Sequence, residues 1–87
     1  MNFVQYDLGP LSGGEVASVE VREQANVLLM DQHNFTRYQR RQPFNYYGGQ
    51  ALNSRVRLGV PGPGHWYVVL DLGGASGTIH SNLTLAS

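Results

Sequence analysis

The chain has 87 residues, enough for one domain and too few for two separate cores. It has no cysteine, which excludes disulfides, thiolate zinc sites and a cysteine nucleophile. The N-terminus lacks the basic flank and apolar run of a signal peptide, and no apolar stretch approaches the ~20 residues of a membrane span. We therefore expect a cytoplasmic domain that does not enter a membrane.

The net charge of zero hides a separation of the two signs along the chain. Residues 1–31 hold five acidic residues and one arginine, whereas residues 32–60 hold five arginines and no acidic residue. The cations are all arginines, which bind carboxylates and phosphates through two parallel hydrogen bonds. This pattern favours an anionic partner. Self-association also stays open, because the acidic third of one copy could pair with the basic segment of another.

Three strands are expected in the first third of the chain, over residues 2–8, 15–22 and 26–31, because β-branched and apolar residues recur there in short runs. The third of these is the continuous apolar run Val27–Leu28–Leu29–Met30, which predicts a strand covered on both faces. Residues 32–53 are polar and aromatic without a clean period, and no structure is predicted for them.

The last third predicts strands over residues 54–60, 65–72 and 78–86. Facing residues of a sheet must share a face, so Val60 is expected opposite Trp66 and Asp71 opposite His80. The expected fold class is therefore all-β: a single compact antiparallel β-sandwich or barrel-like domain over residues 1–87, with a C-terminal three-stranded meander. Trp66 should be the largest core side chain of that meander.

Four blocks of the sequence resemble those of a small bacterial family, the domain-of-unknown-function family numbered eighteen eighty-three. They are residues 6–9 (YDLG), 26–31 (NVLLMD), 46–49 (YYGG) and 64–74 (GHWYVVLDLGG). The resemblance spans nearly the whole chain and implies a compact all-β domain. Some members are joined to signalling-type domains, which implies an interaction module. The resemblance implies no activity, cofactor or catalytic residue.

The predicted register places Arg55, Asp71 and His80 in one row across three strands. An aspartate that orients a histidine is half of a hydrolytic triad. The neighbouring positions offer no nucleophile, however, so a cross-strand ion pair is the favoured interpretation and a small hydrolase the least favoured one. We expect no enzyme activity and no catalytic residues.

No cofactor or metal site is expected. His33, His65 and His80 lack the short spacing that places ligands on one turn or one strand face. The glycine-rich residues 73–77 lack the Gly-Lys-Ser/Thr ending of a phosphate-binding loop, so we interpret them as a hairpin loop.

The segment over residues 34–49 interleaves arginines with aromatic residues and contains no acid. Such a segment could hold an acidic protein surface, or single-stranded nucleic acid by phosphate pairing and base stacking. It could equally be a solvated loop whose aromatics pack on the core edge. We expect an acidic protein partner. Nucleic acid is the less favoured alternative, because domains that bind it usually have a pI above about 9, whereas this chain has a net charge of zero. The candidate partner-binding residues are Arg37, Tyr38, Arg40, Arg41, Tyr46, Tyr47 and Arg57.

Overall fold

The computed structural model describes residues 3–52, 54–72 and 77–87 of the chain. In chain order the elements are β1 (Phe3–Leu11), β2 (Val16–Val21), β3 (Ala25–Asp31), α1 (Gln32–Gln39), β4 (Tyr47–Ala51), β5 (Ser54–Gly59), β6 (Gly64–Asp71) and β7 (Ser81–Ala86). Each of the six expected strands is present, which confirms the all-β class. Two elements, α1 and β4, lie in the segment for which no structure was predicted.

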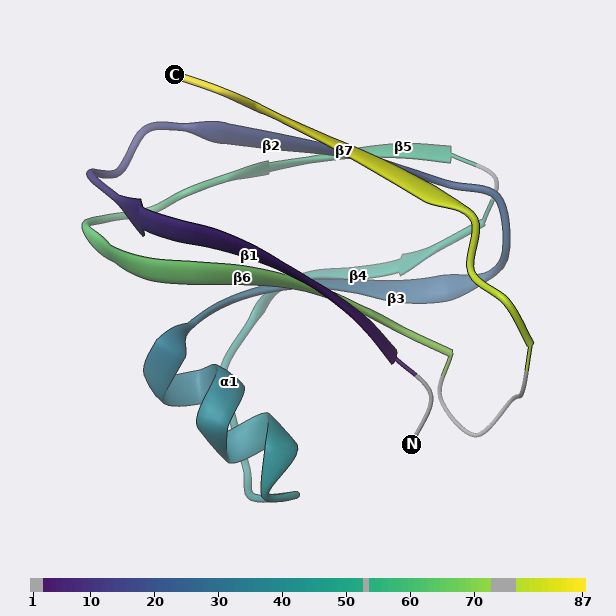
Figure 1. Ribbon diagram of the computed structural model, residues 1–87, viewed down its shortest axis with the longest axis horizontal. Helices are drawn as coiled ribbons and strands as arrows, with labels where there is room; N and C mark the ends of the chain where they lie inside the picture. Colours follow the sequence, from purple (N-terminus) through teal and green to yellow (C-terminus); the bar gives the residue numbers. More distant parts are fainter. Residues whose placement is uncertain (1–2, 53, 73–76) are drawn as a thin grey trace.

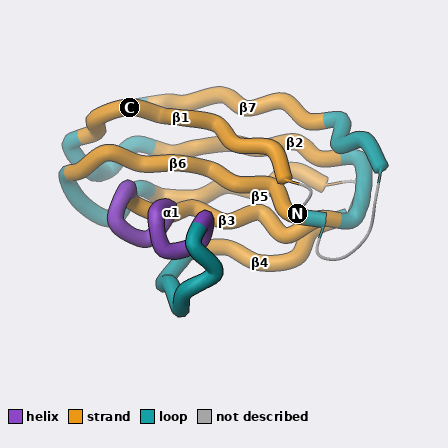
Figure 2. Tube along the Cα trace, turned by 60° about the horizontal axis from the view of Figure 1, so that its bottom comes forward, coloured by secondary structure: helices purple, strands orange, loops and turns teal. Residues whose placement is uncertain are grey.

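The strands form two antiparallel sheets that pack face to face (Figure 1). One sheet has four strands in the order β1-β6-β3-β4, and the other has three in the order β5-β2-β7. The helix α1 lies on the outer face of the four-stranded sheet and adds a third layer (Figure 2). The predicted β-sandwich is therefore confirmed, with one helix added to it.

The main core fills the space between the two sheets. Strand β2 shows how it forms, because Ala17, Val19 and Val21 are buried while Glu20 between them is exposed. Trp66 belongs to this core with 6% of its surface exposed, and its indole Nε1 donates a hydrogen bond of 3.0 Å to the carbonyl of Gly62. The expected core role of Trp66 is thus confirmed, and its one polar atom has a partner.

Strand β3 is buried on both faces, as the continuous apolar run predicted. Val27 and Leu29 are fully buried in the core between the sheets. Leu28 and Met30 point the other way, into a second cluster that includes Phe35 and Tyr38 of α1. A strand that is apolar on both faces needs a cover on its outer side, and α1 provides it.

The predicted C-terminal meander is wrong. Strand β6 pairs with β1 and β3, whereas β5 and β7 lie in the other sheet on either side of β2. Val60 and Trp66 do belong to the same core, but from opposite sheets. The alternation of apolar and polar residues shows which face of a strand is buried. Because two facing sheets bury their inner faces in the same core, the alternation cannot show which strand is the neighbour within a sheet.

The pairing of Asp71 with His80 is wrong for the same reason. Asp71 lies opposite Phe3 of β1 and Asn26 of β3, while His80 precedes the first residue of β7. The hairpin loop expected at residues 73–77 falls mostly on residues 73–76, which lie outside the described part of the chain.

The helix α1 is set by its cap and by two buried aromatic residues. The carboxylate of Asp31 accepts from the backbone N–H and from the side-chain amide of Asn34, both at 2.9 Å. Phe35 and Tyr38, three positions apart, are buried against the sheet. The helix ends at Gln39 with Arg40 as its C-cap, and Arg41 then adopts a left-handed conformation with φ of 59°. With eight residues, α1 is too short to show a clear helical period in the sequence.

Strand β4 ends the four-stranded sheet and contains two glycines. Gly48 has a φ of 124°, and a Cβ atom there would lie 2.1 Å from the carbonyl oxygen of Val27. A Cβ atom on Gly49 would meet nothing within 4 Å. Only the first glycine is therefore required by the backbone.

We expect Gly48→Ala to lower the free energy of unfolding by about 2 kcal/mol or more, because it combines a positive φ with a backbone clash. The matched control Gly49→Ala should change it by no more than about 0.5 kcal/mol. Urea unfolding of both variants measures the difference. Equal losses would show that β4 does not pair with β3 in this register.

Candidate interaction surface

Each of the six carboxylates accepts a hydrogen bond inside the fold. Three of them hold loops or chain irregularities in place. Glu15 accepts from the backbone N–H groups of Ser12 and Gly13, at 3.0 and 2.8 Å. Asp7 accepts from the N–H of Gly9 at 2.9 Å, where the pairing of β1 with β6 shifts register. Glu23 accepts from the N–H of His80 at 2.6 Å.

These hydrogen bonds lower the pKa of all three carboxyls below their ordinary values. The backbone N–H of Gly9 and then the imidazole of His65 lower that of Asp7, and the backbone and then the ring of His80 lower that of Glu23. For Glu15 the leading cause is the N–H of Ser12. The resulting stability is present above the ordinary carboxyl pKa of about 4 and is lost as the pH falls through the lowered values.

The other three carboxylates bind side chains or cap the helix. Glu20 of β2 faces Arg55 of β5, and their side chains pair at 2.6 Å. Asp31 caps α1, as described above. Asp71 accepts a short hydrogen bond from the hydroxyl of the buried Tyr38, which ties α1 to the end of β6.

The expected row of Arg55, Asp71 and His80 is therefore wrong, because each of the three has a different partner. Arg55 pairs with Glu20, Asp71 accepts from Tyr38, and the imidazole of His80 contacts Glu23 at 2.6 Å. Asp71 and His80, the two residues on which the hydrolase hypothesis depended, therefore do not contact each other as that hypothesis requires.

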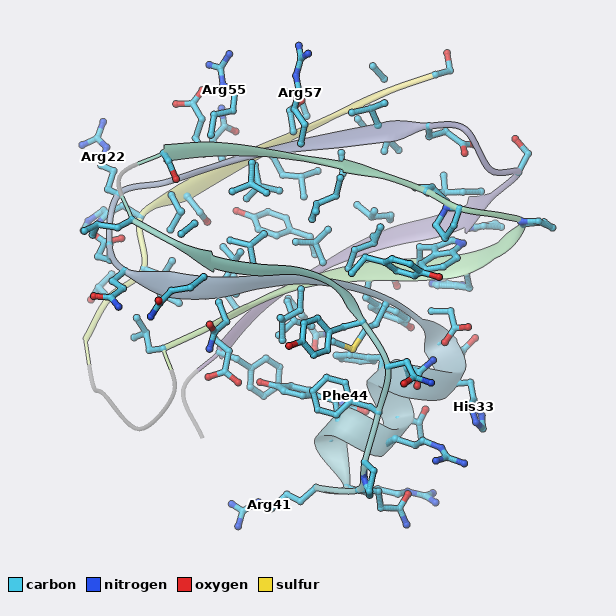
Figure 3. The ribbon with its side chains drawn as sticks, turned by 180° about the vertical axis from the view of Figure 1, so that it is seen from behind. Arg22, His33, Arg41, Phe44, Arg55 and Arg57 are labelled. Carbon is cyan, nitrogen blue, oxygen red and sulfur yellow. The ribbon has the colours of Figure 1, made fainter. Side chains whose placement is uncertain are left out.

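Five of the six arginines form no ion pair with a carboxylate in the described residues, and Arg55 is the exception. They fall into two groups on opposite sides of the molecule (Figure 3). The sheet-face group consists of Arg22, Arg55 and Arg57, at the three-stranded sheet. The helix-end group consists of Arg37, Arg40 and Arg41, in the last turn of α1 and just after it.

The two groups differ in the charges around them. Arg22 and Arg55 of the sheet-face group border an open hollow of about 900 Å³, whose lining also includes Glu20 and His80. Glu20 neutralises Arg55, and Glu23 lies against His80, so this face carries both signs. Around the helix-end group, Asp31 lies at the far end of α1, about 9 Å along the helix axis from Arg37 and about 13 Å from Arg40. Asp71, held by Tyr38, is only partly exposed.

Beyond the helix-end group the chain is fastened to α1. The backbone N–H of Gln42 donates to the carbonyl of Arg37 at 2.9 Å, and the guanidinium of Arg37 donates to the carbonyl of Pro43 at 3.4 Å. The N–H of Asn45 donates to the side chain of Asn34 at 2.8 Å. These hydrogen bonds, together with the edge-on packing of Phe44 against Tyr38, fix the backbone that follows the helix-end group against α1.

The seven candidate residues from the sequence do not form one site. The structure brings together Arg37, Arg40 and Arg41 at the end of α1. Tyr46, which is 48% exposed, lies in the chain that follows them and is connected to α1 through Phe44, whose ring contacts both Tyr46 and Tyr38. We call the three arginines and Tyr46 the helix-end surface.

The remaining three candidates lie elsewhere. Tyr38 is 5% exposed and belongs to the core, so its place among the binding residues was wrong. Arg57 lies on the sheet face, on the opposite side of the molecule (Figure 3). Tyr47 is exposed, but its ring is directed toward Trp66, at a centroid distance of 6.3 Å. Sequence proximity had grouped residues that the sandwich separates.

The described residues contain no group of three or more histidine, cysteine, aspartate or glutamate side chains that could hold a metal ion. His33 is exposed on α1, while His65 and His80 contact Asp7 and Glu23. Within the same part of the chain, no helix is long and apolar enough to cross a membrane.

A family model described as domain of unknown function (DUF1883) matches residues 1–87, the whole chain, and the chain therefore belongs to this family. The resemblance seen in the sequence blocks is thereby confirmed. No curated protein and no solved structure matched the chain significantly.

The hydrogen bond between Tyr38 and Asp71 predicts a loss of stability in alkali. Burial first, and then the hydrogen bond to Asp71, raise the pKa of Tyr38 above its ordinary value near 10. The folded state therefore favours the protonated phenol. This stabilisation is complete below pH 10 and is lost as the pH rises from about 10 toward the raised pKa.

We expect Tyr38→Phe to lose about 1 kcal/mol at neutral pH and to reduce the alkaline loss of stability. Tyr46→Phe is the matched control, because Tyr46 makes no hydrogen bond to a carboxylate in the described residues. Urea unfolding between pH 8 and about pH 11 compares the three proteins. An alkaline slope in Tyr38→Phe as steep as in the wild type would contradict the assignment.

Proposed function

We propose that this domain is a non-enzymatic interaction module that binds an acidic segment of another protein through the helix-end surface. One observation carries the proposal: all six carboxylates are engaged within the fold, while the arginines of the helix-end surface pair with none of them. Their positive field is therefore not cancelled by an ion pair and attracts an anionic surface.

The composition of the helix-end surface supports a protein partner. Arginine guanidinium groups bind carboxylates through two parallel hydrogen bonds, and arginine and tyrosine are enriched at the energetic centres of protein interfaces. Tyr46, which is 48% exposed, offers an aromatic contact in the chain that follows the three arginines. The fixed loop lowers the entropy that binding would cost.

Nucleic acid is the second candidate, and the geometry favours it less. Single-stranded nucleic acid needs a row of exposed aromatic rings on which successive bases stack. Here Tyr46 packs beside Phe44 near α1, whereas the ring of Tyr47 is directed toward Trp66. The two exposed tyrosines thus lie in different environments, and their rings do not form a continuous surface on which successive bases could stack.

The proposal predicts that the protein binds a labelled polyglutamate peptide more tightly than a labelled oligothymidine of the same length. Binding should weaken between about 0.1 M and about 1 M salt, because the Debye length falls from ~10 Å to ~3 Å. Replacing Arg40 and Arg41 with glutamate should weaken binding by about tenfold or more. Fluorescence anisotropy measures each affinity.

The matched control replaces Arg22 and Arg57, which lie on the opposite face, with glutamate. It makes the same change in net charge and should leave the affinity within about twofold. Replacing Arg40 and Arg41 with lysine should weaken binding only partly, because the charge stays and the planar fork is lost. Equal weakening by the two glutamate pairs would contradict the proposal, and tighter binding of the oligothymidine would favour the nucleic-acid candidate.

A further inference from the structure

The free edge of β4 lies next to the helix-end surface. Strand β4 is the last strand of its sheet, and within the described residues it pairs with β3 alone. Its other edge therefore carries backbone N–H and C=O groups without a strand partner. The following inference rests on the proposed function and concerns how an acidic segment is held.

The other three edge strands are protected or lie in a different electrostatic setting. The edge strand β1 contains Asp7, Pro10 and a shift in register, three features that discourage the addition of another strand. Charged arginines lie along β5. Strand β7 has no charge of its own, but it pairs with β2, whose Glu20 lies opposite Asn82 and repels an anion.

Strand β4 has none of these protections. Its sequence, YGGQA, contains no charge and no proline. The close approach that Gly48 permits is made by Val27 of β3, whereas a Cβ atom on Gly49 would meet nothing within 4 Å, so space beside Gly49 is open. The uncharged, proline-free run YGGQA is the signal in the sequence that could have identified this edge.

The edge of β4 continues toward the arginines. After Arg41 the chain passes Phe44 and rises without a helical turn into β4 (Figure 3). Residues 42–51 span at most about 33–36 Å when fully extended. A single extended peptide of similar length could therefore lie along β4 and still reach the helix-end surface.

We propose that the partner segment binds as an added strand on the edge of β4. An antiparallel addition suits this sheet, because all its existing pairs are antiparallel and antiparallel pairing is slightly more stable. In that direction the C-terminal half of the peptide lies beside Tyr47 and continues to Arg37, Arg40 and Arg41. The carboxylates of the partner therefore belong in that half.

Charge decides between this occupant and a second copy of the chain. A second copy would bring its own uncharged β4 and its own arginines, because residues 32–60 contain no acid. It would leave the helix-end surface without carboxylates. An extended acidic peptide supplies both the backbone groups and the negative charge.

The probe for the test is the amidated peptide Thr-Val-Thr-Val-Thr-Glu-Ser-Glu-Ser-Glu. Two further versions carry N-methyl groups, one on the second and fourth amides and the other on the third and fifth. Successive N–H groups of a strand point to opposite edges, so only one of these sets faces β4. We expect one methylated peptide to bind at least about tenfold more weakly than the parent and the other to bind about equally.

Amide hydrogen exchange gives the matching observation on the protein, since alternate amides of β4 should exchange more slowly in the complex. Equal affinity of all three peptides would overturn strand addition while leaving the proposed function standing. Failure of the parent peptide to bind at low salt would instead contradict the proposed function itself. Formation of a β4-linked dimer by the protein alone would show that the edge belongs to a second copy.

Discussion

The fold depends on the burial of two central strands on both of their faces. Leu28 and Met30 of β3 and Tyr67 and Val69 of β6 form an apolar surface on the outer side of the four-stranded sheet. Such a surface is costly to leave in water, at roughly 25 cal/mol for each Å² of apolar area. The short helix α1 covers it. The positions of Arg37, Arg40 and Arg41 follow from this requirement, because these residues lie where that helix ends.

A second constraint is the use of the carboxylates. A small domain has few residues with which to fix its loops, and here the acidic ones do so. Glu15 holds the turn before β2, Glu23 holds the chain before β7, and Asp31 starts the helix. A net charge of zero is therefore compatible with an attractive surface for anions. The negative charges are held in local hydrogen bonds, whereas three positive charges stand together at one end of α1.

The sequence predicted the strands better than their arrangement. Alternation located β2, β5 and β6, and the run Val27–Leu28–Leu29–Met30 identified the strand with two buried faces. The partners of β6 could not be found in this way, because both sheets turn their apolar faces to the same core. Asp31 is a residue type that often caps a helix, and it does cap α1. The helix has only eight residues, however, which is too few for its apolar residues to show a helical period in the sequence.

The candidate site was predicted in part. The acid-free run and its arginines pointed to the helix-end group, which the structure assembles from Arg37, Arg40 and Arg41. Tyr38 could not be recognised as a core residue from its neighbours, since its burial depends on the contact of α1 with β6. Arg57 was included because of its sequence position, and only the separation of the two sheets shows that it faces away.

The arginines at the helix end pair with no carboxylate of the described residues, whereas Arg55 is held within the fold by Glu20, so we expect an acidic ligand to bind at the helix end. The most direct test is to follow the side-chain Nε–H resonances of all six arginines by NMR while the polyglutamate peptide is added. We expect the signals of Arg37, Arg40 and Arg41 to shift together in a saturable way, while those of Arg22, Arg55 and Arg57 stay in place. Equal shifts at all six arginines, or a first shift at Arg55, would contradict this expectation.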